Sequence, residues 1–451
     1  MIGCGAGGGT AAQFARKTDR KADVVVFEKG KYPQYSKCGL PYAISGKIPS
    51  FSSLVEFSEE WFEKAKIDLF LETTVERIDV GKKIVLAKKG NETIEKSYGK
   101  LVIATGAVPF IPPIDGIKEN GRLLKGIFCV RTIDDAKMIL SAVKKGGNVS
   151  IIGAGLIGLE MADNLNEMGM NVTVVEALDQ ILPNALDADM AKIVQEEMPS
   201  HIKIFTSHLA TKTEGDGGSI SKILIKNNET GETQEIETNL LILSAGCNAE
   251  TTLAKDAGCK LNEKGYIVVN EKSETSVRDI YAVGDCTEFI DFVTKKPMPI
   301  GLGSIGVRQA IAAGINAAGG EHLLPFGVLK TCTSHLFGLE VASVGSTISS
   351  YECEIVSGKF NGSSLPEYFP GGKPITIKVF AEESGKILGA QAVGDNAAQR
   401  INTFACAILA GMDVDTLRKL ETAYAPPVAP TLDPVTLACD VVFMKLDRRR
   451  R

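Results

Sequence analysis

The chain has 451 residues, enough for about three domains of typical size. Its 50 Lys and Arg residues against 55 Asp and Glu residues give a net charge of −5, so the sequence offers no positive field for nucleic acid. No apolar run approaches the roughly 20 residues that span a bilayer, and no basic segment followed by an apolar signal core begins the chain. These features predict a cytoplasmic protein that binds neither nucleic acid nor membrane.

A glycine-rich turn, Gly3-Cys4-Gly5-Ala6-Gly7-Gly8, opens the chain. Residues 10–16 have the pattern of a helix, and residues 23–28 have that of a buried strand that ends in Glu28. Glycines let the backbone approach a pyrophosphate, the helix N-terminus favours its charge, and the acid can bind a ribose hydroxyl. Only Met1 and Ile2 precede the turn, so we expect a start further upstream. The predicted site comprises Gly3, Gly5, Ala6, Gly8, Glu28 and Lys29.

The next elements complete the first part of this domain, which we place at residues 1–110. A helix is predicted at 59–65 and a buried strand at 101–106. The strand ends in Thr105-Gly106, and such small residues suit a backbone that passes close to a bound cofactor. We therefore add Thr105 and Gly106 to the first site.

A second turn, Gly153-Ala154-Gly155-Leu156-Ile157-Gly158, repeats the pattern in a domain that we place at 111–239. Strand 149–152 leads into it, helix 159–165 follows, and strand 171–176 ends in Glu176. Two complete units predict two bound nucleotides. The second site comprises Gly153, Gly155, Leu156, Ile157, Gly158, Glu176 and, after the apolar strand 240–246, Gly246.

The chain then returns to its first domain over 240–322. Strand 280–286 contains Gly284-Asp285, where a carboxylate can bind a polyol at the carboxyl end of a sheet, and 303–318 is predicted as a small-residue helix. Residues 323–451 form a predicted α+β domain with strands 341–344, 375–380 and 387–393 and helix 399–410. We expect the closing run 448–451, four arginines, to be a solvated tail.

The ten cysteines are scattered, and the closest two are twelve positions apart. This spacing predicts neither a zinc nor an iron–sulfur site, so we expect no metal. Cys38 stands in Tyr35-Ser36-Lys37-Cys38-Gly39-Leu40-Pro41-Tyr42, and a solitary redox thiol can form only a sulfenic acid or a mixed disulfide with an outside thiol. Lys37 and a following helix N-terminus could lower its pKa. We expect Cys4, Cys129, Cys406 and Cys439 to be inert, buried hydrophobes.

Over essentially its whole length the chain resembles the pyridine nucleotide-disulfide oxidoreductases. The two turns, Glu28, Thr105-Gly106 and Gly284-Asp285 carry this resemblance. It implies two Rossmann-like domains of α/β class, an FAD domain interrupted by an NAD(P)H domain, with Asp285 on FAD, and a C-terminal α+β dimerisation domain. Cys38 resembles the single-cysteine branch, which contains CoA-disulfide reductases, NADH oxidases and NADH peroxidases. In that branch Ser-Phe usually begins the motif, where this chain has Gln34-Tyr35.

The resemblance implies that NADH reduces FAD and that Cys38 then receives the electrons and reduces CoA disulfide or a related small disulfide or persulfide. Tyr424, in Glu421-Thr-Ala-Tyr-Ala-Pro-Pro-Val428, matches a tyrosine that the partner subunit of a homodimer places at this cysteine, and Tyr368 is a weaker match for the same pocket. Arg16, Lys17 and Lys37 match positions that contact the CoA phosphates.

Two other hypotheses for the function remain open. The chain could be an NADH oxidase that reduces O2 at the flavin, or a non-enzymatic flavin-bound redox sensor. Oxidases and peroxidases of the branch often carry a histidine in the first turn, where this chain has Ala6. Glu176 would bind both ribose hydroxyls of NADH and repel the extra phosphate of NADPH, so NADH is the expected donor, with NADPH as an alternative.

Overall fold

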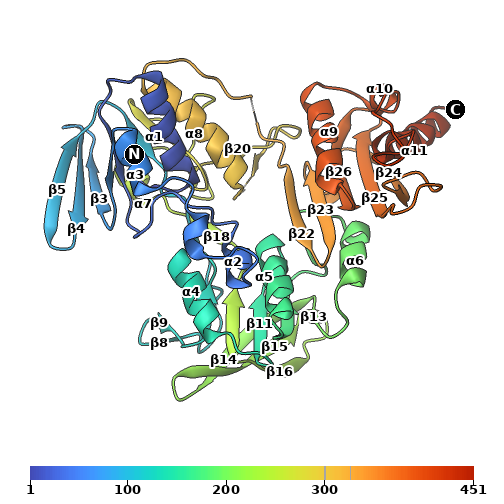
Figure 1. Cartoon of the computed structure of the whole chain (residues 1–451), viewed down its shortest axis with the longest axis horizontal. Helices are drawn as coiled ribbons and strands as arrows, with labels where there is room; N and C mark the ends of the chain where they lie inside the picture. Colours follow the sequence, from blue (N-terminus) through green and yellow to red (C-terminus); the bar gives the residue numbers. More distant parts are fainter. Residues whose placement is uncertain (299–300, 326) are drawn as a thin grey trace. The chain divides into compact units, whose positions relative to one another are not determined.

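The computed structural model describes residues 1–298, 301–325 and 327–451. Contacts divide the chain into two compact units. Unit 1 contains 1–110, 131–136 and 246–328, and unit 2 contains 111–130, 137–245 and 329–451. Both units combine helices with sheets, which confirms the predicted α/β class (Figure 1). The bounds of the four predicted segments remain predictions.

A parallel sheet forms the centre of unit 1. Its strands are β1 (Val24–Phe27), β2 (Ile67–Phe70), β6 (Leu101–Ile103) and β19 (Ile280–Ala282). β1 pairs with β2 and β6 pairs with β19, while Ile2 joins the two pairs by bridging to Phe27 and to Ile103. The short segment before the first turn therefore takes the position of the central strand.

Two helices, α1 (Ala6–Thr18) and α8 (Gly303–Ala317), pack together on one face of this sheet (Figure 1). Small residues make this close approach possible, because a Cβ on Gly314 would lie only 2.4 Å from the carbonyl oxygen of Ala11. Both helices were predicted from the sequence. Their packing holds the first turn, at the start of α1, against the sheet.

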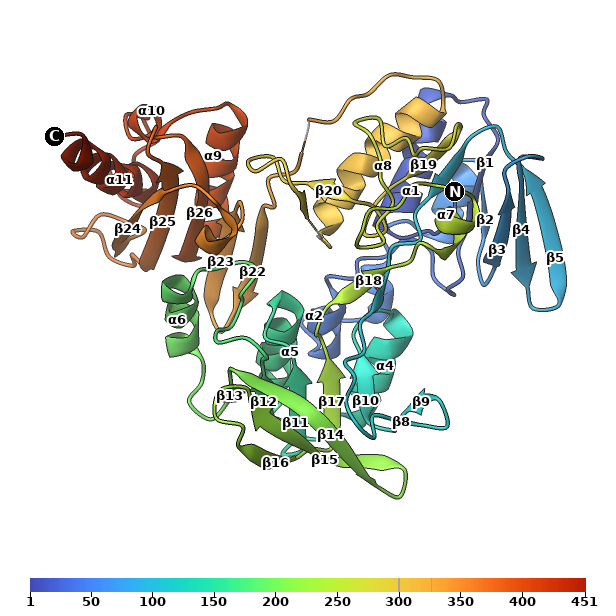
Figure 2. The ribbon, with the colours of Figure 1, turned by 180° about the vertical axis from the view of Figure 1, so that it is seen from behind.

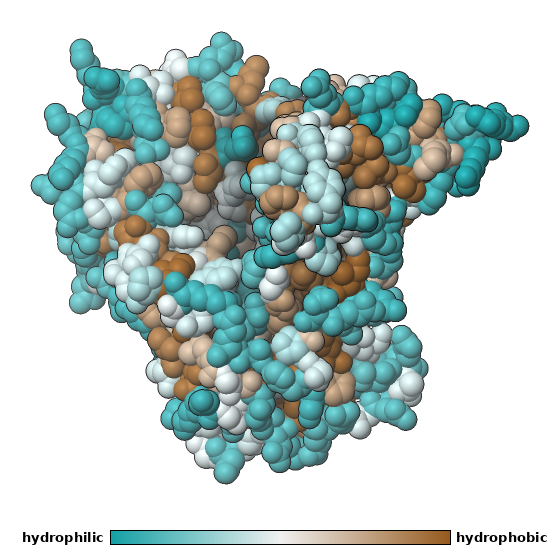
Figure 3. Space-filling model, turned by 45° about the vertical axis from the view of Figure 1, so that its right-hand side comes forward, coloured by the Kyte–Doolittle hydropathy of each residue, from teal (hydrophilic) through white to brown (hydrophobic). Residues whose placement is uncertain are grey.

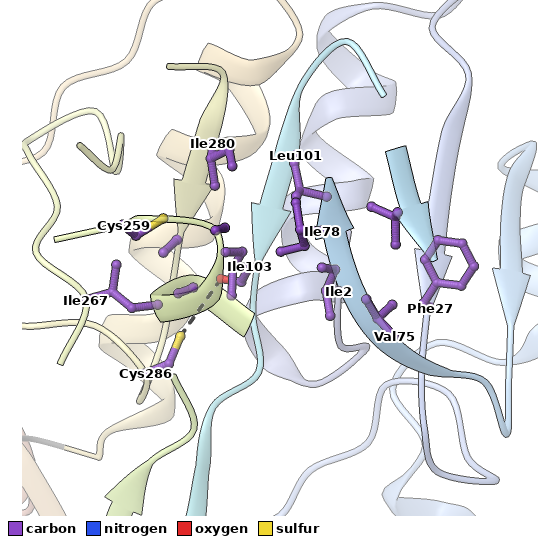
Figure 4. Close-up of a cluster of buried hydrophobic side chains, with 14 of the residues drawn as sticks. Ile2, Phe27, Val75, Ile78, Leu101, Ile103, Cys259, Ile267, Ile280 and Cys286 are labelled. Carbon is purple, nitrogen blue, oxygen red and sulfur yellow. Dashed lines mark hydrogen bonds between the residues drawn. The ribbon is translucent and has the colours of Figure 1, made fainter. Parts of the chain in front are cut away.

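The other face of the sheet packs on an antiparallel meander of β3 (Thr74–Asp79), β4 (Ile84–Lys89) and β5 (Glu92–Ser97). Figure 4 shows the core between them, in which Ile2 and Ile103 of the sheet lie near Ile78 of β3. Cys259 and Cys286 are buried in the same core, so these thiols serve packing. The remaining elements of unit 1 are α2 (Leu40–Ile44), α3 (Glu59–Lys64), β7 (Ala107–Pro109), β18 (Cys247–Ala249), α7 (Thr252–Asp256), β20 (Phe289–Ile290) and β21 (Pro297–Met298).

Unit 2 contains a five-stranded parallel sheet in the order β10 (Ile127–Cys129), β17 (Leu240–Leu243), β11 (Asn148–Ile152), β12 (Asn171–Val175) and β13 (Lys203–Phe205). Helix α5 (Leu156–Glu167) packs on β11 and β12. An antiparallel sheet of β14 (His208–Asp216), β15 (Ser219–Asn227) and β16 (Thr233–Glu237) also packs on it (Figure 2). This part also holds α6 (Ala188–Glu197), β8 (Lys118–Glu119) and β9 (Arg122–Leu123), and α4 (Ile133–Ala142) begins in unit 1 and ends here.

The C-terminal part of unit 2 is an antiparallel sheet in the order β22 (Cys332–Leu336), β23 (Leu339–Val344), β26 (Ile387–Gly394), β25 (Pro374–Glu382) and β24 (Ile355–Ser363). It is covered by α9 (Ala397–Leu409) and α11 (Pro434–Arg450), with α10 (Val414–Leu417) beside α11. The predicted α+β arrangement is confirmed. Arg448, Arg449 and Arg450, however, form the last turn of α11 rather than a tail, and Arg449 pairs with Glu354 at 2.5 Å.

Hydrophilic residues cover most of the face shown in Figure 3. Within the described residues, no helix is long and apolar enough to cross a membrane.

Candidate active site

The first glycine turn has a backbone that only glycine allows. Gly3 has φ +96°, and a Cβ there would lie 2.4 Å from the carbonyl oxygen of Ala104. A Cβ on Gly8 would lie 1.8 Å from the carbonyl oxygen of Gly3, whereas Gly5 faces open space. Among the described residues, no side chain caps the amides at the start of α1. The turn thus leaves a cradle of the kind that binds a pyrophosphate.

The acid after the next strand is held by the same turn. Oε2 of Glu28 accepts a hydrogen bond from the amide of Cys4 at 2.7 Å, and Oε1 accepts one from the amide of Gly30 at 2.7 Å. Carboxylate oxygens have further lone pairs, so these bonds fix the orientation of Glu28 and leave acceptor capacity for a ribose. Lys29 beside it is exposed.

The second turn reproduces this arrangement in unit 2. A Cβ on Gly158 would lie 2.0 Å from the carbonyl oxygen of Gly153, and Gly155 faces open space. Glu176 is buried, and its two oxygens accept from the amides of Ala154 at 2.7 Å and Leu178 at 2.9 Å. Leu156 and Ile157 form the first turn of α5, with Ile157 exposed. The chain therefore contains two cradles of the same design.

Two further predicted residues of unit 1, Asp285 and Gly106, lie beside Arg131, which was not predicted as a site residue. Nη2 of Arg131 lies 3.3 Å from Oδ2 of Asp285, and a Cβ on Gly106 would lie 3.5 Å from the same nitrogen. The hydroxyl of Thr105 donates to the carbonyl oxygen of Glu250 at 2.5 Å. Gly246, which was predicted for the second site, belongs to unit 1, whereas Gly153–Gly158 and Glu176 belong to unit 2. It is exposed, and its carbonyl oxygen accepts a hydrogen bond from the amide of Phe110. Arg131 thus adds a cation to the end of the sheet where Asp285 stands.

The loop that carries Cys38 reaches this same group. Cys38 is exposed, and α2, a helix of five residues, begins two positions later. Part of the Lys37 side chain reaches solvent. The surrounding protein nevertheless desolvates its ammonium, and this desolvation, together with the positive charge of Arg131, lowers the pKa of Lys37 to about 8. The negative charges of Glu28 and Asp285 act in the opposite direction. Lys37 therefore lies in the electrostatic field of the first site.

Tyr35, on the same loop, is packed against the segment that carries Arg131. Burial raises its pKa to about 12, while a hydrogen bond from the backbone of Ile133 works in the other direction. The phenol therefore stays protonated, and the loop before Cys38 is fixed to the segment after Arg131.

The two candidate tyrosines lie together in unit 2. The hydroxyls of Tyr368 and Tyr424 are 2.7 Å apart, and both side chains are exposed. The hydrogen bond between them raises the pKa of Tyr368. They form a pair of phenols on the surface of the C-terminal part, where they can donate protons to a neighbouring group.

Comparison with known proteins identifies the family. Residues 1–313 match the family described as "Pyridine nucleotide-disulphide oxidoreductase", and residues 332–435 match its dimerisation domain. The chain belongs to this family. The pyridine nucleotide-disulfide oxidoreductases carry FAD and use a pyridine nucleotide, so the chain is an oxidoreductase with two nucleotide-binding domains and a C-terminal dimerisation domain.

Three relatives within the pyridine nucleotide-disulfide oxidoreductases are similar over nearly the whole chain. An "NADH oxidase" of Methanocaldococcus jannaschii is 38% identical and covers 100% of this chain and 99% of its own. An "NAD(P)H coenzyme A polysulfide/persulfide reductase" of Pyrococcus horikoshii is 32% identical, with 98% and 97% covered. The solved structure of an NAD-dependent persulfide reductase from A. fulgidus is 34% identical, with a TM-score of 0.94, and 99% of this chain and 83% of that chain are covered.

The FAD that the family carries fits the first cradle. The open side of Gly5, the uncapped amides of α1 and the acid Glu28 match a pyrophosphate and a ribose, and Arg131 and Asp285 match phosphate and polyol oxygens. The second cradle matches NADH or NADPH by the same argument.

Of the residues predicted for CoA, Arg16 is already engaged. Its guanidinium donates to four backbone carbonyl oxygens, at 3.0 Å to Ala65, 3.4 Å to Asp19, 2.9 Å to Arg20 and 2.6 Å to Lys66. This pattern is that of a structural clamp between the ends of α1 and α3. Lys17 is exposed, with its ammonium 4.6 Å from the centre of the Phe14 ring.

The four cysteines that we expected to be inert and buried divide into two groups. Cys4 and Cys439 are buried, and burial raises the pKa of each to about 12. Cys406 is exposed and Cys129 only partly buried, so the prediction of burial is wrong for these two. Cys406 lies on α9, and sequence alone did not show which face of that helix meets the sheet.

Proposed function

We propose that this pyridine nucleotide-disulfide oxidoreductase uses NADH to reduce CoA disulfide, or a related small disulfide or persulfide, through Cys38. The observation that carries the proposal is the exposed thiol of Cys38 beside Lys37, whose ammonium interacts with Arg131, Glu28 and Asp285 of the first cradle. This geometry supports a reactive sulfur next to the bound cofactor.

The two cradles would hold the two cofactors. FAD would bind the turn Gly3–Gly8 with Glu28, Thr105, Gly106 and Asp285, as predicted, and Arg131 would add a cation for its phosphates. NADH would bind the turn Gly153–Gly158 with Glu176. When bound, FAD supplies a two-electron carrier between the nicotinamide and the sulfur of Cys38.

The sulfur chemistry of Cys38 balances with one NADH for each disulfide. The thiolate attacks CoA disulfide, so that a disulfide between Cys38 and CoA forms, the S–S bond of the substrate breaks and one CoA thiolate leaves. Two electrons from NADH then break the new disulfide, which regenerates the Cys38 thiolate and releases the second CoA thiolate. Each departing thiolate takes up one proton. With a CoA persulfide, the products are one CoA thiol and one hydrogen sulfide.

The departing thiolates need a proton donor, and the phenols of Tyr424 and Tyr368 are suited to that role. Both tyrosines are exposed on the dimerisation domain, and this supports a site that two subunits of a homodimer share. In this proposal, Tyr424 of one subunit faces Cys38 of the other. The hydrogen bond between the two hydroxyls lets Tyr368 orient Tyr424.

We further propose a cytoplasmic location, because ten scattered cysteines suit a reducing compartment.

CoA carries phosphates, and Lys17 and Lys37 are the cations that we propose for them. Lys17 is exposed at the end of α1, and Lys37 stands beside the reactive sulfur. Arg16 has its donors on carbonyl oxygens, so in this proposal it holds α1 and α3 together and contacts no substrate.

NADH is the proposed nicotinamide donor. Glu176 is buried and presents a carboxylate at the end of β12, where the 2′-phosphate of NADPH would meet a negative charge. The next residues, Ala177, Leu178 and Asp179, are exposed and contain no cation that could bind this phosphate.

An NADH oxidase is the second candidate function, because the relative from M. jannaschii has that name at 38% identity. The two activities differ in their need for Cys38, since oxygen can accept electrons without an enzyme thiol. Ala6 in the first turn supplies no histidine for oxygen chemistry, and this favours the disulfide reductase.

The deciding experiment compares Cys38→Ser with Cys406→Ser, which changes an exposed cysteine on α9. NADH oxidation is followed with CoA disulfide under nitrogen and with oxygen alone. We expect Cys38→Ser to lose disulfide reduction by more than a hundredfold and to keep its oxygen consumption, while Cys406→Ser keeps both. Full disulfide reduction by Cys38→Ser would refute the proposal. Binding of both cofactors with negligible turnover of the unchanged protein would favour the redox sensor.

A further inference from the structure

The loop after β12, residues 177–187, contacts the second glycine turn. The amide of Leu182 donates to the carbonyl oxygen of Ala154 at 2.9 Å. Leu182 is buried and has φ +50°, a conformation that leucine adopts only when its surroundings hold it there. The position of this loop therefore contributes to the position of the turn.

The far end of the 177–187 loop is fixed on the C-terminal sheet. The amide of Asp187 donates a hydrogen bond to Oε1 of Gln391 at 2.9 Å. Oδ1 of Asp187 accepts a hydrogen bond from the amide of Ile348 at 2.9 Å. Oδ2 of Asp187 lies 2.9 Å from Nζ of Lys378, and the side chains of Asp187 and Lys378 are only 12% and 10% exposed. The same Nζ lies 2.6 Å from Oδ1 of Asp189, whose side chain is 43% exposed and also pairs with Lys359. Lys378 of β25 and Gln391 of β26 are direct cross-strand neighbours, so side chains from two paired strands bind Asp187 at one polar site.

Helix α5, which begins at the same turn, has its own contacts with the C-terminal sheet. The hydroxyl of Ser334 on β22 donates to Oε1 of Glu160 at 2.6 Å, and the amide of Phe337 donates to Oδ2 of Asp163 at 3.1 Å. Both elements that define the second cradle are thus attached to the same part of unit 2.

We infer that Asp187 and Lys378 are positioning residues for NADH, through which the C-terminal sheet sets the geometry of the nucleotide-binding turn. The pair is largely removed from water, so loss of the lysine leaves the carboxylate of Asp187 without its cation and forces the end of the loop to move. Only four residues separate Asp187 from Leu182, so this movement reaches the hydrogen bond to Ala154. The inference rests on the proposed NADH site at Gly153–Gly158 and Glu176.

The test measures the affinity of the full-length, FAD-loaded protein for NAD+ by titration calorimetry, since NAD+ does not reduce the flavin. We expect Lys378→Met to weaken NAD+ binding about tenfold, which corresponds to about 1.4 kcal/mol, with unchanged FAD content. The double variant Asp187→Asn/Lys378→Met should restore affinity to within threefold, because the amide keeps the bond to Ile348 and leaves no buried charge. Lys359→Met is the matched control, since Lys359 is 37% exposed and pairs with Asp189, the second partner of Lys378, while the pair between Lys378 and Asp187 stays in place. The affinity of this control should change less than twofold.

A Lys378→Met protein that melts earlier but binds NAD+ within twofold of the unchanged protein would overturn the inference, because the pair would then stabilise the fold alone. If Lys378→Met does not fold, Gln391→Leu decides: we expect about threefold weaker NAD+ binding, and unchanged binding overturns the inference. Glu176→Ala serves as reference. If that variant also binds NAD+ normally, the proposed NADH site itself is wrong.

Discussion

Gly155→Ala separates the binding role of the second turn from its structural role. Gly155 has φ −74° and ψ −176°, values that alanine adopts freely, and a Cβ there would have no atom within 4 Å. The free energy of unfolding should therefore change by less than about 0.5 kcal/mol. The new methyl group would occupy the space through which a pyrophosphate reaches the amides of α5. Loss of two charge-assisted hydrogen bonds costs about 3 kcal/mol, so NAD+ affinity should fall by roughly a factor of a hundred.

The assay for Gly155→Ala is NAD+ titration of the FAD-loaded protein together with urea unfolding. Two controls frame the result. Gly5→Ala changes the equally open position of the first turn and should lower FAD content while it leaves the second site intact. Gly153→Ala, at φ +102° and with its Cβ 2.7 Å from the carbonyl oxygen of Ser244, should reduce stability by about 1–3 kcal/mol. Wild-type NAD+ affinity in Gly155→Ala would refute the assignment of this turn to NADH.

Variants at Glu176, Tyr424 and Arg16 test the nucleotide preference, the proton donor and the substrate contact separately. Glu176→Ala combined with Ala177→Arg should reverse the preference for NADH over NADPH at least tenfold in kcat/KM, and an unchanged ratio would contradict the role of Glu176. Tyr424→Phe should lower kcat for CoA disulfide about ten- to a hundredfold with little change in FAD content, and equal kcat would exclude the phenol as proton donor. Arg16→Met should lower the free energy of unfolding by about 1–3 kcal/mol and change KM for CoA disulfide less than twofold. A raised KM without lost stability would show that Arg16 contacts CoA after all.

The sequence predicted those features of the fold and site that are local along the chain. Each turn, its helix and the acid at the end of the next strand lie within about 30 residues, and glycine and carboxylate have few substitutes there. Helix α11 was missed although Asp433, which caps it, and Pro434 are recognisable start signals.

Contacts between distant residues could not be predicted in this way. Arg131 belongs to neither glycine turn, and it reaches Asp285 across 154 positions. The polar site that binds Asp187 depends on the pairing of β25 with β26. Asp187 itself stands 204 positions before Gln391 in the sequence. The exposure of Cys406 depends on how α9 is rotated on the sheet. Such features follow from tertiary packing and leave no periodic signal in the sequence.

In the proposed mechanism, Cys38 exchanges sulfur partners with an outside disulfide. Mass spectrometry of the reduced protein, after treatment with one equivalent of CoA disulfide in the absence of NADH, detects this exchange. We predict one CoA attached per chain on the peptide that contains Cys38, one CoA thiol released, and loss of the adduct when NADH is added. An adduct on another cysteine, or an unmodified Cys38 in a protein that still reduces CoA disulfide, would contradict the proposed role of Cys38.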